Sequence, residues 1–163
     1  SEAYVMFQAM ATGHGGLCTM HADSLESASK RLQQKPMDIP PSYLSLMNCA
    51  IVIRRVKEQD GKSTRKAISV QEINTADSYK STFMWDSKSD YFNANLDDSI
   101  MLQRIAEQSG RDMEQIFDEY EKRKIVLRWL LQHGIRSYAK VAENIGKYYR
   151  DPETLMKKIE CGG

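Results

Sequence analysis

The sequence predicts an α/β half that extends to about Thr75 and a helical half that begins after Asn95. Two observations support this division. Two β-rich runs, Cys49 to Lys57 and Arg65 to Ile73, flank an Asp-Gly turn signal and predict a β-hairpin. Beyond Asn95, helix-start and helix-stop residues separate apolar stripes at helical spacing. With 163 residues, the chain is long enough to bury one hydrophobic core.

The first predicted elements are a helix, a strand and a second helix. Apolar residues at helical spacing predict a helix over Glu2 to Met10, and Gly13 supplies a stop. Alternation predicts a short strand over Leu17 to Ala22, followed by a helix over Asp23 to Gln34. We expect Asp23 to cap that helix, with Glu26 as its capping-box partner. A strand that leads into a capped helix is half of an α/β unit, whose ligands bind at the carboxyl ends of the strands.

The middle of the chain contains turns and strands. Prolines between Pro36 and Pro41 break the chain into a turn-rich connection. In the predicted hairpin, Asp60 and Gly61 form the turn signal within residues 59–62. Thr82 to Trp85 predicts one further short strand, and residues 86–95 show no clear helical period. The change from α/β to helical character therefore falls in this region.

Four helices are predicted in the second half, over Asp98 to Ser109, Asp112 to His133, Ser137 to about Tyr149, and from a cap at Asp151 onward. The second of these begins with a capping box between Asp112 and the residue three positions later, Gln115. Its predicted buried stripe consists of Met113, Ile116, Phe117, Tyr120, Leu127, Leu130 and Leu131.

Charge and cysteine content restrict the class of protein. The net charge of +1 gives no bulk electrostatic reason to expect DNA or an acidic membrane as a partner. Cys18, Cys49 and Cys161 are widely spaced and fit free thiols in a reducing cytosol. No apolar run approaches the roughly 20 residues of a membrane helix, and we expect a cytoplasmic protein. The chain begins within a helical pattern and without methionine, so we also expect it to be a fragment.

Two of the three histidines lie in one glycine-rich stretch, residues 12–24. His14, Cys18 and His21 are zinc-ligand types, but strand alternation places Cys18 and His21 on opposite faces. The same alternation weakens a Cys18 nucleophile paired with a histidine base. Glycine amides and a histidine at a strand end can donate to phosphate oxygens, which predicts phosphate or nucleotide contact. A purely structural role, in which the two histidines brace the turn, stays open beside these chemistries.

The same stretch resembles the histidine box of the type II/IV secretion ATPases, most closely the archaeal branch that powers pilus, archaellum and secretion machines. The resemblance rests on Thr-Gly-His at residues 12–14, Thr-Met-His-Ala at 19–22, and the following helix with Arg31 and Leu32. It extends over further short segments, at residues 40–43, 53–56, 72–73 and 85–90, and more loosely at 121–124 and 148–152. Nearly the whole chain is therefore covered.

This resemblance implies a fold and a division into domains. The fold is an incomplete RecA-like domain of the P-loop NTPase class, of which the chain holds the C-terminal part with a β-hairpin, followed by a small helical domain. Residues 1–75 are then the C-terminal part of the ATPase domain, residues 76–95 a linker with a short strand, and residues 96–160 the helical C-terminal domain.

The resemblance also implies site residues. His14 and His21 are expected near the ATP γ-phosphate as catalytic residues, and His21 is the stronger candidate because it ends the predicted strand. Gly13 and Thr19 are expected to contact the nucleotide. The expected site residues include no metal ligand. Two further candidates, Arg54 and Arg55, could reach the nucleotide of a neighbouring subunit or face solvent, whereas Arg31 is expected to support the fold.

For the intact protein, the resemblance implies a hexamer that binds ATP and Mg²⁺ between subunits. Such a motor drives export or filament assembly through a membrane platform protein, at the inner face of the membrane. The chain departs from this family in one respect, since it contains neither a Gly-x₄-Gly-Lys-Ser/Thr loop nor the acidic Mg²⁺-binding motif. We therefore expect this chain alone to bind neither ATP nor Mg²⁺ and to be inactive as an ATPase.

An alternative of a different class is a non-catalytic interaction module that docks on a partner of the secretion machine. Residues 96–121 hold eight acidic and two basic residues, and residues 122–158 hold ten basic and three acidic residues. This uneven charge fits a solvated bundle matched to its helix dipoles, or a docking surface. Residues 135–149 resemble a short helix-turn-helix in their spacing, but the charge is balanced within the chain, and no nucleic acid is expected as a partner.

Overall fold

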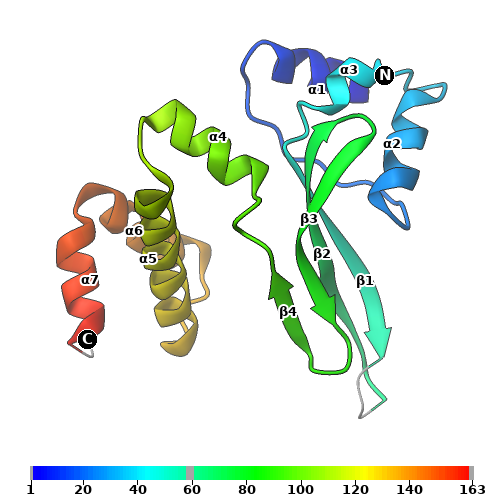
Figure 1. The fold of residues 1–163 in the computed structure, drawn as a ribbon. Coiled ribbons are helices and arrows are strands. Elements are labelled where there is room, and N and C mark those ends of the chain that lie inside the picture. The colour runs from blue at the N-terminus through cyan, green and yellow to red at the C-terminus, as the bar shows by residue number, and fades with distance from the viewer. Residues whose placement is uncertain (1, 58–60, 162–163) are drawn as a thin grey trace. The chain divides into compact units, whose positions relative to one another are not determined.

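The structure is a computed structural model that describes residues 2–57 and 61–161. Within them the chain forms a mixed α/β fold, with one four-stranded antiparallel sheet and seven helices (Figure 1). Two compact units divide it, Ser1–Arg104 and Ile105–Gly163. The first unit contains α1 (Glu2–Ala11), α2 (Leu25–Gln33), α3 (Pro41–Leu44), β1 (Cys49–Lys57), β2 (Ser63–Thr75), β3 (Ser78–Asp86), β4 (Tyr91–Ala94) and the start of α4 (Ile100–Ser109). The second unit contains the rest of α4 with α5 (Met113–Gln132), α6 (Tyr138–Arg150) and α7 (Pro152–Glu160).

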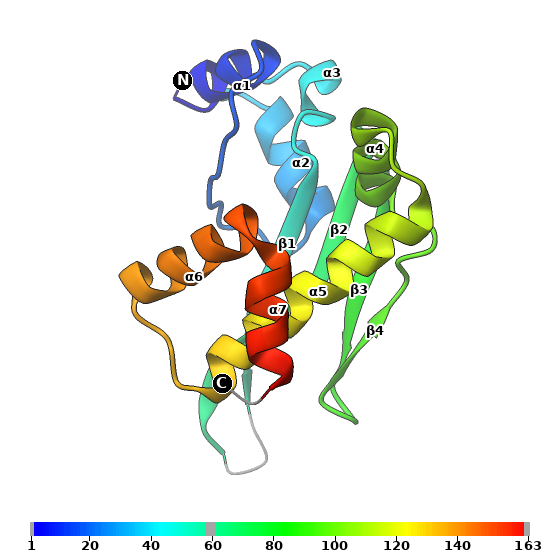
Figure 2. The same ribbon diagram turned by 90° about the vertical axis from the view of Figure 1, so that its left-hand side faces the viewer.

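An apolar cluster holds the first three helices together. Phe7 of α1 is completely buried and belongs to one cluster with Leu32 of α2, Ile39 and Leu44. The helix predicted over Glu2 to Met10 is therefore confirmed, with Phe7 as its buried residue. In both views α1, α2 and α3 gather at one end of the sheet (Figure 1, Figure 2).

The second helix, α2, is present but begins one residue later than its predicted cap implies. Ser24, not Asp23, is the N-cap, and its hydroxyl accepts a hydrogen bond from the Ser27 amide at 3.1 Å. The predicted partner Glu26 instead forms an ion pair with Lys30 at 2.7 Å. Serine and aspartate are about equally good caps, so the sequence does not decide between neighbouring positions.

The prediction of a strand over Leu17 to Ala22 is wrong. Residues 14–22 lie outside the helices and strands, and they are exposed except for the half-buried Met20. A strand requires hydrogen bonds from a neighbour, and no described strand pairs with this segment. The predicted α/β unit consequently does not form, and His21 does not lie at the end of a strand.

The predicted hairpin is confirmed. β1 spans the predicted residues, and β2 contains the predicted run from Arg65 to Ile73. The two strands pair antiparallel, with a bulge next to Val52. Gly61 has φ of +82°, as a tight turn requires, whereas Gln59 and Asp60 of the predicted turn lie outside the described residues.

Two further strands complete the sheet in the order β1-β2-β3-β4. The short strand predicted over Thr82 to Trp85 is the second half of β3. β4 was not predicted, because its four residues are too few to show an alternating pattern. The ends of β1 and β2 near residues 57 and 63 lie far from α1–α3, as does the β3–β4 turn (Figure 1, Figure 2).

A buried carboxylate on the sheet fixes the start of α4. Glu72 of β2 is only 4% exposed, and its Oε1 accepts a hydrogen bond from the Ser99 hydroxyl at 2.7 Å. Its Oε2 accepts another from the Met101 amide at 3.1 Å. Ser99 Oγ in turn accepts from the Leu102 amide at 3.1 Å. These contacts satisfy free N–H groups of the first helical turn, so α4 starts at a defined place on β2.

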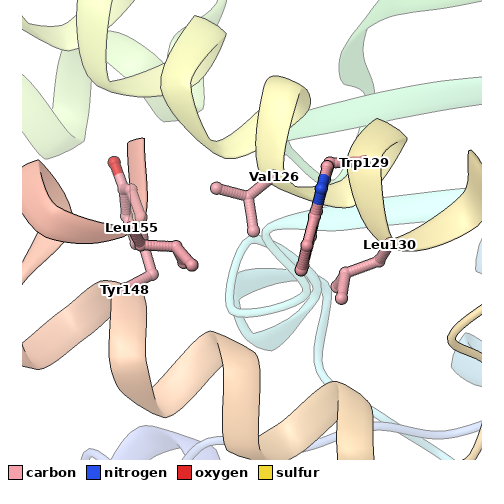
Figure 3. Packing of buried hydrophobic residues seen from close by; sticks show 5 residues of the cluster. All are labelled: Val126, Trp129, Leu130, Tyr148 and Leu155. Carbon is pink, nitrogen blue, oxygen red and sulfur yellow. The ribbon is translucent and has the colours of Figure 1, made fainter. Parts of the chain in front are cut away.

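The second unit is built around one face of α5. The predicted capping box is confirmed, because Asp112 accepts from the Gln115 amide at 2.8 Å and the Gln115 side chain accepts from the Asp112 amide. The predicted cap of the last helix is also confirmed, since Asp151 accepts from the Thr154 amide. Five residues from α5, α6 and α7 form the core, namely Val126, Trp129, Leu130, Tyr148 and Leu155 (Figure 3).

The buried stripe predicted on α5 is partly wrong. Ile116 and Leu130 are buried, but Leu127 is 55% and Leu131 61% exposed. The helix carries two apolar stripes, and α6 and α7 pack on the one that contains Val126 and Trp129. Periodicity detects apolar stripes but does not tell which of them a neighbouring helix covers.

Among the described residues, no helix combines the length and the apolar character needed to cross a bilayer.

Candidate functional site

The glycine-rich segment holds His14 against the end of α1. The His14 amide donates to the Ala9 carbonyl at 3.1 Å, and the ring Nδ1 lies 3.2 Å from that oxygen. The Thr12 hydroxyl donates to the same carbonyl at 2.8 Å and lies 3.1 Å from Nδ1. These contacts all use Nδ1, whichever ring nitrogen carries the proton, because the Thr12 hydroxyl can either donate to Nδ1 or accept from it. Nε2 of His14 is therefore the ring nitrogen left for a ligand.

Two arginines fix the backbone on either side of Ala22. Arg31 of α2 donates from Nη1 to the His21 carbonyl at 2.9 Å. Arg54 of β1 donates from Nη2 to the Asp23 carbonyl at 2.8 Å. The segment thus lacks strand pairing but is tied to both α2 and β1. The expectation that Arg31 supports the fold agrees with its contact to the His21 carbonyl.

An open depression lies beside these contacts and is lined by Met20, His21, Ala22, Asp23, Ser27, Arg31 and Ile53. The His21 imidazole, the Ser27 hydroxyl and the Arg31 guanidinium can donate hydrogen bonds to an anion. The Asp23 carboxylate repels an anion. The Arg31 guanidinium uses only one of its five N–H donors for the His21 carbonyl in the described structure. This arrangement can bind a phosphate group through side chains, with the Asp23 carboxylate limiting its position.

The structure places the predicted site residues in two groups. His21 borders the depression, whereas Gly13, His14 and Thr19 are not among its lining residues. Gly13 has φ of +90°, in the left-handed region that favours glycine, and turns the chain out of α1. Thr19 is exposed in the unpaired segment. The nucleotide roles of these residues stay predictions.

Two alternatives for the histidine segment lack supporting geometry. Across residues 2–57 and 61–161, no group of three or more His, Cys, Asp or Glu side chains could hold a metal ion. Cys18 is an exposed free thiol, and no hydrogen bond joins it to a histidine in the described structure.

The sequence alone did not reveal the contacts of Arg31 and Arg54 to backbone carbonyls. Every residue carries a carbonyl, so such bonds leave no pattern in the sequence. Ser27 and Ile53 were missed as lining residues for a related reason. They lie beside the segment only because the fold brings α2 and β1 next to it. The one signal in the sequence for these contacts was Arg31, in the Arg-Leu pair near the end of the helix that follows the histidines.

Residues 88–163 match the model of the PilB3-like C-terminal family. This match relates the C-terminal part of the chain to the C-terminal region of a pilus or secretion ATPase. It covers β4, α4 and the whole second unit, and it does not include the histidine segment.

Three proteins of Methanocaldococcus jannaschii are similar to the chain over most of its length. The uncharacterized protein MJ0900 is 30% identical over 159 residues, which cover 91% of this chain and 28% of that protein. The uncharacterized protein MJ1287 is 35% identical over 133 residues, covering 78% and 48%. The uncharacterized protein MJ0781 is 30% identical over 149 residues, covering 86% and 20%. The chain thus spans less than half the length of these relatives.

Proposed function

We propose that this chain is the C-terminal part of a hexameric ATPase that powers protein secretion or the assembly of a pilus or archaellum. The observation that carries the proposal is the match of residues 88–163 to the PilB3-like C-terminal family. The histidine motif at residues 12–22 adds independent support, because it lies outside the matched region. In this proposal residues 1–75 belong to a RecA-like domain whose phosphate loop lies elsewhere in the protein.

The histidine segment then contributes to the ATP site. Nε2 of His14 and the ring of His21 are the proposed contacts near the γ-phosphate, with Gly13 and Thr19 beside the nucleotide. Support comes from the bonds that fix Nδ1 of His14 and from the two guanidiniums that hold the backbone around His21. A donor held in place before the reaction stabilises developing charge without the cost of reorganisation.

ATP and Mg²⁺ bind in this proposal only where the phosphate loop and the acidic motif are also present. The chain alone is then inactive, and the intact protein works as a hexamer with a membrane platform protein at the cytoplasmic side of the membrane. Arg54 positions the histidine segment, because its guanidinium is bonded to the Asp23 carbonyl. Arg55 is left for a contact with another polypeptide.

The test is made in the full-length protein that contains this chain. In His21→Ala we expect kcat for ATP to fall by about 10²-fold, as for the loss of one donor to a transition state. The Kd for a non-hydrolysable ATP analogue is expected to change by less than about threefold, roughly 0.6 kcal/mol. Glu26→Ala is the matched control, since Glu26 is exposed on α2 and is not among the lining residues of the depression. An unchanged kcat in His21→Ala, or an equal loss in Glu26→Ala, contradicts the catalytic role.

A docking role for the helical unit is the second candidate, favoured by the exposed Leu127 and Leu131 on α5. The uneven charge of this unit favours it less, because acids and bases pair within α5, as in Asp118–Lys122 at 2.6 Å. If docking is the function, Leu127→Ser with Leu131→Ser in the intact protein abolishes co-purification with the platform protein. Full ATPase activity with unchanged co-purification in that variant contradicts docking through this face.

A further inference from the structure

The core of the second unit covers only one side of α5. Val126, Trp129 and Leu130 form that side, and the partly buried side chains that pack on this core come from α6, α7 and the turn before α6. Another stripe of six residues runs along α5 outside this core, namely Met113, Phe117, Tyr120, Lys124, Leu127 and Leu131. Leu127 and Leu131 are 55% and 61% exposed, and the other four side chains are half-buried. We call this stripe the α5 seam.

The spacing of the α5 seam is typical of a helix that packs lengthwise on another helix. Its residues follow one another at steps of four and three, which are the d and a positions of a heptad repeat. The a positions hold Phe117, Lys124 and Leu131, and the d positions hold Met113, Tyr120 and Leu127. A surface helix needs one apolar stripe to pack on its own domain, and α5 already packs its other stripe against α6 and α7. The α5 seam is therefore a second packing surface.

The charges that flank the α5 seam have opposite signs at its two ends. Glu114 and Arg128 are both exposed, and their side chains form no ion pair or hydrogen bond with any residue in the described ranges. They lie 14 residues apart, about 21 Å along the helix, so they do not pair with each other. The acidic residues between them each form an ion pair within α5, namely Asp118, Glu119 and Glu121. One acid and one base at opposite ends of the seam are thus left for another polypeptide.

We propose that the α5 seams of two copies of this chain pack against each other as antiparallel helices related by a two-fold axis. Each a position then meets a d position of the other copy. The facing residues of the two copies are Met113 with Leu131, Phe117 with Leu127, and Tyr120 with Lys124. Each contact occurs twice, as in any isologous pair.

The polar residue in the α5 seam favours antiparallel over parallel packing. A parallel pair places Lys124 against Lys124 of the partner subunit, with two like charges in the seam. An antiparallel pair places it against Tyr120 of the partner subunit instead. These two side chains already attract each other within one helix, where the Lys124 ammonium lies 5.6 Å from the centre of the Tyr120 ring.

The flanking charges make the α5 seam complementary to itself. Glu114 and Arg128 occupy the same heptad position, next to a d residue, and antiparallel packing brings Glu114 beside Arg128 of the partner subunit. The opposite end of the pair holds the same contact, so both unpaired charges of each copy gain a partner. This charge complementarity identifies a second copy of the chain as the occupant of the seam.

This contact goes beyond the proposed function and does not rest on it. The strands that the proposed function places elsewhere in the protein extend the sheet of the first unit, whereas residues 113–132 belong to the second unit. An isologous contact does not by itself close a ring, so the pair joins copies from two hexamers rather than neighbours within one. It also assigns Leu127 and Leu131 to a second copy rather than to the platform protein.

The first test is sedimentation equilibrium of the whole chain. A contact between two single helices is smaller than a standard interface, so we expect a reversible dimer with a Kd of about 10–100 µM. Arg128→Glu and Glu114→Arg each place two like-charge contacts in the dimer, and each is expected to weaken it about tenfold. Lys140→Glu is the matched control, because it reverses an exposed charge on α6 and should leave the Kd unchanged.

A mixture of the two single variants shows which residues face each other. Each variant alone has like charges at both ends of the pair, whereas a mixed pair of Arg128→Glu with Glu114→Arg has opposite charges at both ends. We expect the mixture to form mixed dimers with about the Kd of the unaltered chain, as measured by energy transfer between differently labelled variants.

Disulfide cross-linking carries the test to the full-length protein that contains this chain. In a background free of other cysteines, Met113→Cys with Leu131→Cys is expected to give a covalent dimer on oxidation, because these positions face each other in the pair. Met113→Cys alone should give none, because the two copies of this residue then lie at opposite ends of the pair.

Four results overturn the proposal. The chain stays monomeric at about 1 mM, ten times the highest expected Kd. Arg128→Glu leaves the dimer unchanged, or Lys140→Glu weakens it equally. The mixed variants associate no better than either variant alone. The full-length protein forms no cross-linked dimer, which shows that another part of the protein or another partner covers the α5 seam.

Discussion

The buried contact between Glu72 and Ser99 fixes α4 on the sheet, and Ser99→Ala tests how much the first unit depends on it. Both side chains are nearly inaccessible, at 4% and 2% exposure. The substitution removes the 2.7 Å bond to the Glu72 carboxylate and the 3.1 Å bond from the Leu102 amide. One carboxylate oxygen then stays buried without that donor, and one amide of the first helical turn loses its acceptor.

The expected loss follows from these two bonds. A hydrogen bond to a charged group contributes about 1.5–3 kcal/mol, and a helix-capping hydroxyl contributes about 1 kcal/mol. Ser99→Ala should therefore lower the unfolding free energy of the first unit by about 2–4 kcal/mol. Glu72→Gln keeps the shape but offers one acceptor oxygen instead of two, so it should cost about 1–3 kcal/mol. Because both changes affect one network, the double variant should lose less than the sum.

Hydrogen exchange followed by NMR measures these losses. The slowest amides of β2 report unfolding of the first unit, and the Leu102 amide reports opening of the first turn of α4. Ser109→Ala is the matched control, since its hydroxyl bonds to the Ile105 carbonyl at the exposed end of the same helix. A loss below about 0.5 kcal/mol in Ser99→Ala, the range of ordinary surface changes, would refute the reasoning.

Three further predictions concern the helical unit and the hairpin. Burial and the hydrogen bond to Glu119 raise the pKa of Tyr148 to about 12. The stability gained from this shift is present below pH 10 and lost as the pH rises toward 12, and unfolding midpoints should show that Tyr148→Phe removes this loss. Arg55→Glu turns the like pair with Arg65 into an opposite pair and should raise the unfolding free energy by about 0.5–1 kcal/mol. Leu130→Ala should cost about 2–4 kcal/mol in urea unfolding because the side chain is buried.

Each of these has a result that contradicts it. A pH dependence above 10 that is the same in wild type and Tyr148→Phe shows that this hydroxyl does not carry it. No gain in stability for Arg55→Glu shows that the opposed arginines do not repel appreciably in the folded hairpin. Leu127→Ala, at an exposed position of the same helix, should cost much less than Leu130→Ala, and equal costs contradict the assigned core.

Elements defined by neighbouring residues could be predicted from the sequence. The caps at Asp112 and Asp151 were found because a capping side chain bonds to an amide only three residues away. The β1–β2 hairpin was found because a turn signal between two β-rich runs sets their pairing. In each case the signal and the hydrogen bond lie within one short stretch of chain.

Elements that depend on distant partners could not be predicted. Glu72 and Ser99 are 27 residues apart, and neither has a sequence signature of its own. Which of the two apolar stripes of α5 is buried depends on its packing against α6 and α7, which lie later in the chain. In the candidate site the histidines stood out by their glycine context, but the bonds from Arg31 and Arg54 to the His21 and Asp23 carbonyls were visible only in the structure.

The wrong prediction of a strand from Leu17 to Ala22 has an explanation in the proposed function. It alternates as a strand does, yet it has no strand partner in the described structure. If the remainder of a RecA-like sheet lies elsewhere in the protein, that sheet supplies the missing neighbour. We therefore expect the amides of residues 17–22 to exchange quickly in this chain and to be protected at least about 10²-fold, roughly 2.7 kcal/mol, in the full-length protein. Fast exchange of these amides in both proteins contradicts a strand at this position and, with it, the RecA-like completion of the sheet.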